Sequence, residues 1–178
     1  MNTVKIKDKE FAINIPSGEI QEFVQHVADQ INHDLCNDNP LFVIILNGSF
    51  MFAGDLFKKV NFPCEISFIK LSSYVGTEST SEVKTLIGIN ENIKGRKIVI
   101  VEDIIDTGIT IDHLLNQFKK IGPSEIKIAT LLFKPNAFQK NFKIDYIGKK
   151  IPNDFIIGYG LDYDGYGRNL PDIYKIVS

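Results

Sequence analysis

The sequence predicts an α/β protein with a mostly parallel sheet flanked by helices. Short continuous apolar runs rich in β-branched residues, such as residues 41–46 and 97–101, indicate strands buried on both faces. Amphipathic helical patterns alternate with these runs, and such alternation is typical of βαβ units. Because ligands of parallel sheets bind at the carboxyl ends of the strands, the residues that follow each strand are the first candidates for a site.

The first half of the chain begins with a helix predicted over residues 17–35. Pro16 and Ser17 provide a start signal, and the apolar residues of this segment fall on one helical face. The expected order then continues with a strand over 41–46, a helix over 50–60, a strand over 64–71, a long exposed loop over 72–85 and a returning strand over 86–90.

The second half repeats the alternation. A strand over 97–101 leads to an amphipathic helix around 111–121, which Gly122 and Pro123 close. The remaining strands are expected at 126–133, 142–147, 155–159 and 173–177.

Composition excludes several classes of protein. The 178 residues are 44% hydrophobic and 24% charged, which is unlike a disordered, collagen-like or coiled-coil chain. Twenty basic and 22 acidic residues give a net charge of −2, which disfavours a nucleic-acid partner. The most apolar region, 41–57, is too interrupted to span a bilayer, and residues 1–10 do not form a signal peptide. We therefore expect a cytoplasmic protein with no membrane partner, in which Cys36 and Cys64 are ordinary half-buried thiols.

The strongest chemical pattern follows the strand over 97–101. Glu102 and Asp103 stand at its end, and Asp106-Thr107-Gly108-Ile109-Thr110 opens the next helix. A helix N-terminus attracts phosphate, Gly108 allows close approach, and adjacent carboxylates suit ribose hydroxyls or a hydrated Mg²⁺. The alternative is that Asp106 only caps the helix and that the two acids are solvated.

These residues carry a resemblance to a known family. Residues 101–111 closely resemble the phosphoribosyl pyrophosphate signature of the type I phosphoribosyltransferases. The chain from about residue 41 to 174 is similar to the hypoxanthine-guanine branch of that family. The similar motifs are residues 46–49, 72–74, 131–134 and 151–163, together with Arg168.

The resemblance implies a reaction and a cofactor. A 6-oxopurine base and phosphoribosyl pyrophosphate would give the nucleotide and pyrophosphate, in a purine salvage reaction that uses Mg²⁺. Asp106 matches the general base that acts at purine N7. Thr107, Gly108, Ile109 and Thr110, with Asp106, would cradle the 5′-phosphate, and Glu102 and Asp103 would hold the ribose hydroxyls directly or through Mg²⁺.

The purine site is also implied by the resemblance. Lys134 matches the residue that binds purine O6, Phe155 the ring on which the purine stacks, and Ile156 a residue whose backbone meets the base edge. Without the family, a lysine at a strand end more often reaches solvent, and Phe155 would be a core residue.

Two charged residues near the chain's end complete the ligand set. The resemblance makes Asp162 a purine-site residue and second Mg²⁺ ligand, and Arg168 a pyrophosphate ligand. Each could instead be a plain loop charge. Asp164 is interpreted as solvated.

Two loops complete the site by resemblance. Asn47 and Gly48 match a loop that meets pyrophosphate through backbone N–H groups and contains a non-proline cis peptide, although many members carry lysine where Asn47 stands. Ser73 and Tyr74 match contacts of a mobile loop that closes over the reaction and excludes water. Residues 135–138 lack the basic residue often found there.

The resemblance further implies the type I phosphoribosyltransferase fold. A single domain would span residues 1–178, with a core over about 36–150 and a small hood formed by the N-terminal stretch and residues 151–178. Members usually form homo-dimers or homo-tetramers. Two other hypotheses stay open: a regulator of the same fold that binds nucleotide and RNA, and a nonenzymatic nucleotide-binding protein. The net negative charge disfavours the first, and the retention of Asp106, Lys134 and Phe155 disfavours the second.

Overall fold

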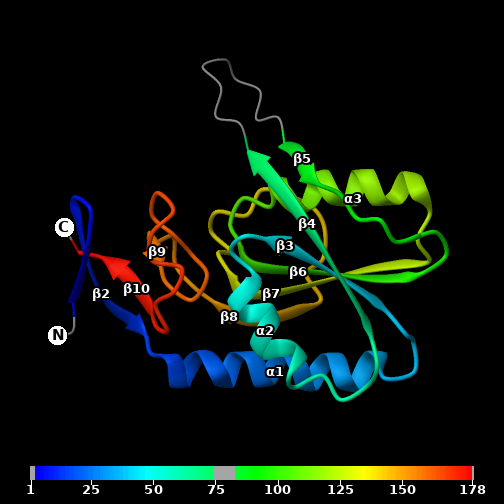
Figure 1. Ribbon diagram of the computed structural model, residues 1–178, viewed down its shortest axis with the longest axis horizontal. Helices are drawn as coiled ribbons and strands as arrows, with labels where there is room; N and C mark the ends of the chain where they lie inside the picture. The colour runs from blue at the N-terminus through cyan, green and yellow to red at the C-terminus, as the bar shows by residue number, and fades with distance from the viewer. Residues whose placement is uncertain (1–2, 74–82, 178) are drawn as a thin grey trace.

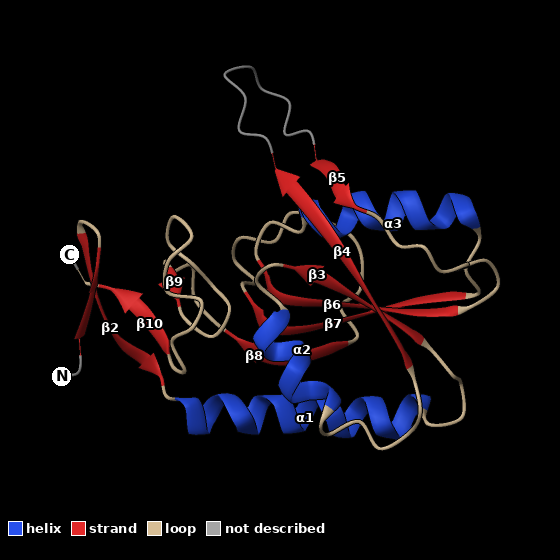
Figure 2. Ribbon diagram, in the orientation of Figure 1, coloured by secondary structure: helices blue, strands red, loops and turns tan. Residues whose placement is uncertain are grey.

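The computed structural model describes residues 3–73 and 83–177, which form two sheets and three helices (Figures 1 and 2). In chain order the elements are β1 (Thr3–Ile6), β2 (Lys9–Ile15), α1 (Ser17–Leu35), β3 (Leu41–Leu46), α2 (Phe50–Phe57), β4 (Glu65–Ser73), β5 (Val83–Ile87), β6 (Lys97–Ile105), α3 (Ile109–Ile121), β7 (Glu125–Phe133), β8 (Tyr146–Lys150), β9 (Ile156–Ile157) and β10 (Ile173–Ile176).

The larger sheet has six strands in the order β5-β4-β3-β6-β7-β8. All neighbours pair in parallel except β4 and β5, which are antiparallel. Figure 1 shows α1 and α2 on one face of this sheet and α3 on the other. Each face has its own buried apolar cluster, so the sheet is covered on both sides, as its continuous apolar strands predict.

The strand order of the larger sheet reverses direction at one position, between β3 and β6. After β3 the chain runs outward to β4 and β5, then returns to the other side of β3 to build β6, β7 and β8. The order therefore reverses between β3 and β6, which pair directly. In open α/β sheets a ligand crevice is expected where the segments that leave the carboxyl ends of two such strands diverge, and we call this place the crevice.

The smaller sheet joins the two ends of the chain. Its antiparallel strands follow the order β1-β2-β10-β9, so β2 pairs with β10 across nearly the whole sequence. We call this sheet, with the loops that connect its strands, the hood. Figure 1 shows it beyond the N-terminal end of α1, beside the larger sheet.

Most predicted elements are present, but several boundaries were wrong, and strands β1 and β2 were not predicted. Helix α2 ends at Phe57 rather than at residue 60, and β5 begins at Val83 inside the segment expected as loop. Strand β6 continues four residues past the expected end at 101, because Glu102 and Asp103 are buried in it. Strand β9 is only two residues long, because Gly158, Tyr159 and Gly160 all have positive φ.

A further wrong boundary concerns the strand expected over residues 142–147, which is β8 at Tyr146–Lys150. Phe142 and Ile144 pack on the α3-side core from a loop. Pairing begins at Asp145, whose N–H donates to the Ile128 carbonyl at 3.0 Å. The apolar residues Phe142 and Ile144 therefore contact the core from a loop and do not form a strand.

Two smaller expectations can also be compared with the structure. Both cysteines are free thiols, but Cys36 is exposed rather than half-buried. No helix within residues 3–73 and 83–177 is long and apolar enough to cross a membrane.

Candidate active site

At the crevice, the loop after β3 packs closely against the end of β6. The peptide bond between Leu46 and Asn47 is cis, and Gly48 lies directly against the carboxylate of Asp103. A Cβ atom at Gly48 would collide with that carboxylate, so any larger residue here would displace the Asp103 side chain. This contact brings the loop after β3 onto the end of β6.

Ser49 fixes the two acidic residues of β6. Its hydroxyl is fully buried, donates to Glu102 Oε1 at 3.0 Å and accepts the Asp103 N–H at 3.0 Å. Glu102 Oε1 also accepts the Asp103 N–H at 3.2 Å, and Asp103 Oδ1 accepts the Ile104 N–H at 2.8 Å. The alternative in which both acids are solvated is therefore wrong.

The carboxylates of Glu102 and Asp103 are buried, and their hydrogen bonds do not fully offset the free-energy cost of burying two negative charges. Glu102 is 8% exposed and Asp103 7% exposed. Burial, and then the neighbouring Asp103 charge, raise the pKa of Glu102 well above its ordinary value, and burial raises the pKa of Asp103 as well. A buried pair of this kind favours a bound cation or hydrogen-bond donors from a ligand.

A bend over residues 106–108 connects β6 to α3 and lines a small hollow. Residues Glu102 and Ile104–Ile111 surround a cavity of about 90 Å³. Gly108 has φ of +83° and serves as the N-cap of α3, with the ring of Phe138 packed where a side chain would be. Asp106 is therefore not the helix cap. A helix N-terminus beside a hollow of this size suits a phosphate.

Asp106 instead pairs with Lys134, which follows the adjacent strand β7. The Lys134 Nζ lies 3.1 Å from Asp106 Oδ2, and the Lys134 N–H donates to the Ile105 carbonyl at 2.9 Å. The lysine side chain is only 11% exposed, whereas that of Asp106 is 48% exposed. Lys134 therefore does not simply extend into solvent. The pair presents one donor and one acceptor side by side at the edge of the crevice.

The hood contributes a second charged pair. Arg168 Nη2 lies 2.7 Å from Asp162 Oδ1, and its Nη1 donates to the Gly160 carbonyl at 2.7 Å. Gly160 in turn packs against the carbonyl of Gly48, again with no room for a Cβ atom. Through this contact the loop that carries Asp162 and Arg168 meets the loop after β3.

Phe155 and Ile156 lie at the start of β9. Phe155 is 46% exposed, so it is not the core residue that its apolar neighbours suggest. Its ring packs at 5.9 Å, edge-on, against Tyr163 and at 6.3 Å from Phe11. Ile156 is buried beside it. A half-exposed, supported ring offers a stacking surface for a planar ligand.

Other residues that the sequence predicted for the site do not group with the acidic pair of β6, or lie outside the described residues. Within the described part of the chain, no three acidic, histidine or cysteine side chains form one metal-binding group, so Asp162 does not join Glu102 and Asp103. Asn47 has an exposed side chain. Asp164 is exposed, as expected, and forms a surface ion pair with Lys7 at 2.5 Å. Tyr74 and the side chain of Ser73 lie outside the described residues.

Sequence reasoning gave no role to Ser49, although the structure places it at the centre of the site. A serine directly after Gly48 was visible in the quoted loop. Its partners were not, because Glu102 and Asp103 are more than 50 residues away along the chain.

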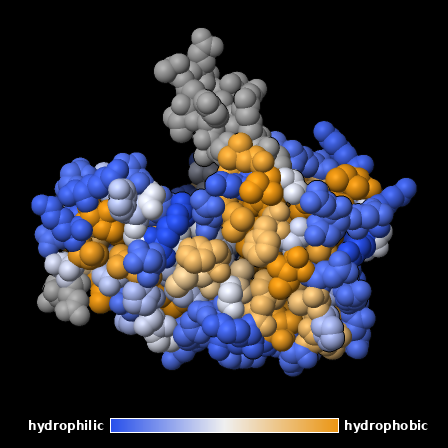
Figure 3. Space-filling model, viewed as in Figure 1, coloured by the Kyte–Doolittle hydropathy of each residue, from blue (hydrophilic) through white to orange (hydrophobic). Residues whose placement is uncertain are grey.

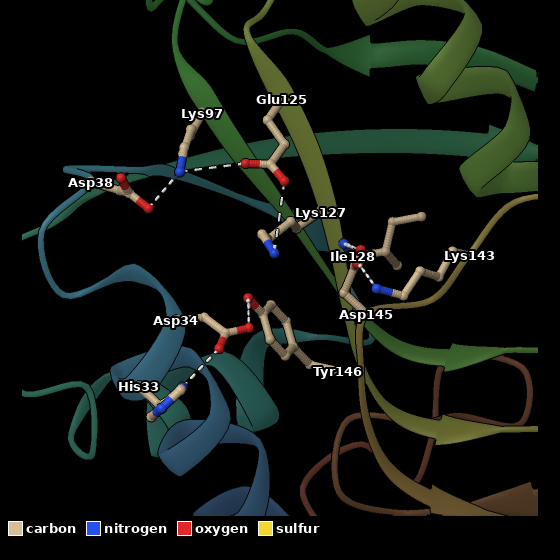
Figure 4. Close-up of polar contacts among 10 residues, drawn as sticks. All are labelled: His33, Asp34, Asp38, Lys97, Glu125, Lys127, Ile128, Lys143, Asp145 and Tyr146. Carbon is tan, nitrogen blue, oxygen red and sulfur yellow. Dashed lines mark hydrogen bonds and ion pairs between the residues drawn. The ribbon is translucent and has the colours of Figure 1, made fainter.

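A different charged cluster lies at the opposite end of the larger sheet (Figure 4). Lys97 bridges Asp38 and Glu125, and the Tyr146 hydroxyl donates to Asp34 Oδ2 at 3.2 Å. These contacts tie the C-terminal end of α1 to the first residues of β6 and to β8. A wider cavity of about 550 Å³ also lies at this end, between α3 and β7. Neither feature touches the crevice, so we interpret the network as structural.

Comparisons with known proteins agree with this geometry. The model of the phosphoribosyl transferase domain matches residues 16–164. A hypoxanthine-guanine phosphoribosyltransferase of Streptococcus pyogenes is 45% identical over 146 residues, 82% of this chain and 81% of the relative. A hypoxanthine-guanine phosphoribosyltransferase of Bacillus anthracis, solved with a HEPES molecule in its active site, superposes with a TM-score of 0.87 at 39% identity and covers 97% of this chain and 100% of its own. A hypoxanthine phosphoribosyltransferase of Staphylococcus aureus superposes with a TM-score of 0.88 at 35% identity, covering 93% and 91%. The chain therefore belongs to the type I phosphoribosyltransferases, in the hypoxanthine-guanine branch of that family.

Proposed function

We propose that this crevice transfers the phosphoribosyl group from phosphoribosyl pyrophosphate to N9 of a 6-oxopurine. Hypoxanthine and guanine are the proposed bases, and the products are the nucleotide and pyrophosphate. The observation that carries the proposal is the Asp106–Lys134 pair beside the phosphate-sized hollow of residues 102–111. A purine with a carbonyl at C6 offers an acceptor for the lysine and an N7 proton for the carboxylate.

Asp106 would take the proton from purine N7 as N9 attacks the anomeric carbon. Its side chain is half exposed, so it can meet an incoming base. Lys134, held between Ile105 and Asp106, would donate to O6 and stabilise charge that develops on the ring. The base must then take over part of the existing ion pair. Phe155 would stack on the purine, with the Ile156 backbone at its edge.

The sugar and its phosphates would lie along the crevice. Asp106 and residues 107–110 would hold the 5′-phosphate through backbone N–H groups and hydroxyls. The backbone of Asn47 and Gly48, with Arg168, would hold pyrophosphate. Ser73 and Tyr74 would close over the complex.

The residues present fit a Mg²⁺ ion. Magnesium in proteins usually keeps several waters and binds through one or two carboxylates plus substrate phosphates, so a cluster of three acids is not required. Glu102 and Asp103 supply two adjacent carboxylates, and burial raises the pKa of both. We propose that they hold the ribose hydroxyls directly or through Mg²⁺, and that Asp162 contributes after release from Arg168. When bound, Mg²⁺ would neutralise the charge of the pyrophosphate leaving group.

We further propose that residues 1–178 act as a single domain, with a core over about residues 36–150 and a hood formed by the N-terminal stretch and residues 151–178. The free thiols Cys36 and Cys64 are typical of reducing compartments and support a cytoplasmic location. An exposed apolar face on β4 and β5 supports assembly as a homo-dimer or homo-tetramer.

A spectrophotometric turnover assay tests the function. Purified protein is mixed with phosphoribosyl pyrophosphate, Mg²⁺ and, separately, hypoxanthine, guanine, xanthine, adenine or uracil, with and without a metal chelator. We expect turnover of hypoxanthine or guanine that the chelator abolishes. If folded protein, with a normal circular dichroism spectrum, shows no turnover of any of the five bases, the proposal is contradicted and the regulator hypothesis is favoured. A measurement of salt-dependent RNA binding would then test that hypothesis.

A further inference from the structure

Asp55 in α2 collects hydrogen bonds from three separate parts of the chain. The Tyr159 hydroxyl donates to its Oδ2 at 2.6 Å, and so does Gln21 Nε2 of α1, also at 2.6 Å. Lys58 Nζ lies 2.6 Å from its Oδ1. Asp55 therefore connects α1 and α2, which belong to the core, with the loop of the hood.

Tyr159 has a backbone conformation that is uncommon for an aromatic residue. Its φ is +48°, between two glycines that also have positive φ. The side chain is buried, with 3% exposure, and its N–H donates to the Leu170 carbonyl at 2.8 Å. Something must hold the residue in this conformation, and the hydroxyl bond to Asp55 is the polar anchor of its side chain.

The next residue, Gly160, makes the contacts that matter for the site. Its Cα lies against the carbonyl of Gly48, its N–H donates to the Arg168 carbonyl at 2.9 Å, and its own carbonyl accepts from Arg168 Nη1 at 2.7 Å. Since Tyr159 is bonded directly to Gly160, the Tyr159 anchor determines where the hood backbone meets the loop after β3.

We propose that Tyr159 and Asp55 are positioning residues, which hold Gly160 between Gly48 and Arg168 and thereby set the pyrophosphate end of the site. This inference rests on the proposed function, since it concerns the two groups assigned to pyrophosphate. It adds residues that do not touch substrate. The helix that begins one residue after Ser49 thus carries, one and a half turns later, the carboxylate that orders the opposite wall of the crevice.

The ionisation of the pair suits a permanent anchor. Burial opposes the charge on Asp55, but the bonds from Lys58, Tyr159 and Gln21 outweigh it and lower the pKa of the carboxyl. Burial, followed by the bond to Asp55, raises the pKa of the Tyr159 hydroxyl. At neutral pH the carboxylate is charged and the hydroxyl keeps its proton, so the donor and acceptor do not change roles during turnover.

The test is Tyr159→Phe, which removes the hydroxyl and keeps the ring. We expect the KM for phosphoribosyl pyrophosphate to rise about 10-fold, the effect of one lost bond to a charged acceptor, with the KM for hypoxanthine within about 2-fold. In the reverse reaction the KM for pyrophosphate should rise equally. KM values do not depend on the fraction of folded enzyme, so a purely structural loss would lower the apparent kcat only.

Tyr146→Phe is the matched control. It also removes a buried tyrosine hydroxyl that donates to an aspartate, Asp34 of α1, but at the opposite end of the sheet (Figure 4). We expect it to lower the melting temperature and to leave both KM values unchanged. An equal shift of KM in the two variants, or no shift in Tyr159→Phe, would overturn the inference. The proposed function would still stand in that case, provided that the wild-type protein shows turnover. A wild-type protein without turnover would overturn both.

Asp55 provides a second line of test. Asp55→Asn keeps an acceptor oxygen and should retain a KM for phosphoribosyl pyrophosphate closer to wild type than Asp55→Ala does. Combining Asp55→Ala with Tyr159→Phe should add nothing to the larger single effect, because both remove the same anchor. Additive effects would mean that the two residues act separately and would contradict the inference.

Discussion

Two kinds of carboxylate meet in the crevice. Glu102 and Asp103 are buried, bonded to Ser49 and backbone N–H groups, and have raised pKa values. Asp106 is half exposed and bonded to a lysine. Different environments divide acidic groups into different tasks: the buried pair suits cation and hydroxyl binding, and the accessible one suits proton transfer.

The proton-transfer role proposed for Asp106 leads to a prediction. Asp106→Asn keeps the size of the side chain and an acceptor for Lys134 but cannot take a proton. We expect kcat to fall by about 100-fold or more, with KM values within about 3-fold of wild type. Steady-state kinetics with hypoxanthine and guanine measure both quantities. Equal losses in kcat and in substrate binding would speak against the general-base role.

At this scale the sequence indicated candidate site residues but not the contacts around them. The run from Glu102 to Thr110 and the strand-end position of Lys134 could be recognised, because local spacing defines them. The bonds of Ser49 to Glu102 and of Tyr159 to Asp55 could not, because they join residues 53 and 104 positions apart. The burial of Glu102 and Asp103 could not be predicted either, because acidic residues are expected to be exposed unless their bonding partners are known.

The elements themselves were predicted where local signals are strong. Helix α1 begins and ends at the expected residues, since Pro16 and Ser17 mark its start and six buried apolar residues mark its inner face. Strand β3 is likewise as expected, being apolar throughout and bounded by Pro40 and Asn47. Errors occurred where tertiary contacts decide, as at the end of β6 and the start of β8.

Two glycines, one inside a helix and one just after the end of another helix, give a paired prediction about stability. Gly122 ends α3 with φ of +85°, whereas Gly18 lies in α1 with open space around it. Gly122→Ala should destabilise the fold by about 1 kcal/mol, and Gly18→Ala should stabilise it by up to about 1 kcal/mol. Thermal unfolding should show shifts of about 2–4 °C per kcal/mol in opposite directions. Shifts of the same sign would contradict this interpretation of the two backbone conformations.

At the scale of the whole molecule, one part of the larger sheet is left uncovered, on its outer strands β4 and β5. Ile66 and Phe68 of β4 and Ile87 of β5 point to the same side, with exposures of 40%, 47% and 49%. Figure 3 shows hydrophobic surface gathered over these strands. Contiguous apolar surface of this kind marks a contact between subunits more often than a free surface.

This face predicts a change of assembly. Replacing Ile66 and Phe68 together with aspartate should convert the protein to monomers, because two charges would be buried in the contact. Ile121→Asp, at a single exposed apolar residue of α3, should leave the mass unchanged and serves as control. Light scattering coupled to size-exclusion chromatography measures the mass. A wild-type monomer, or a variant that keeps the wild-type mass, would contradict the assignment of this face.

The pairing of β2 with β10 has a consequence for how the protein is made. During synthesis β2 emerges early, yet nearly all of the remaining chain must follow before β10 can lie beside it. Until then one edge of β2 has no neighbour and is open to unwanted pairing. The loop that carries Asp162 and Arg168 lies between β9 and β10, so it can be ordered only at this late step. A nascent chain would thus possess a folded core before it possesses a working enzyme.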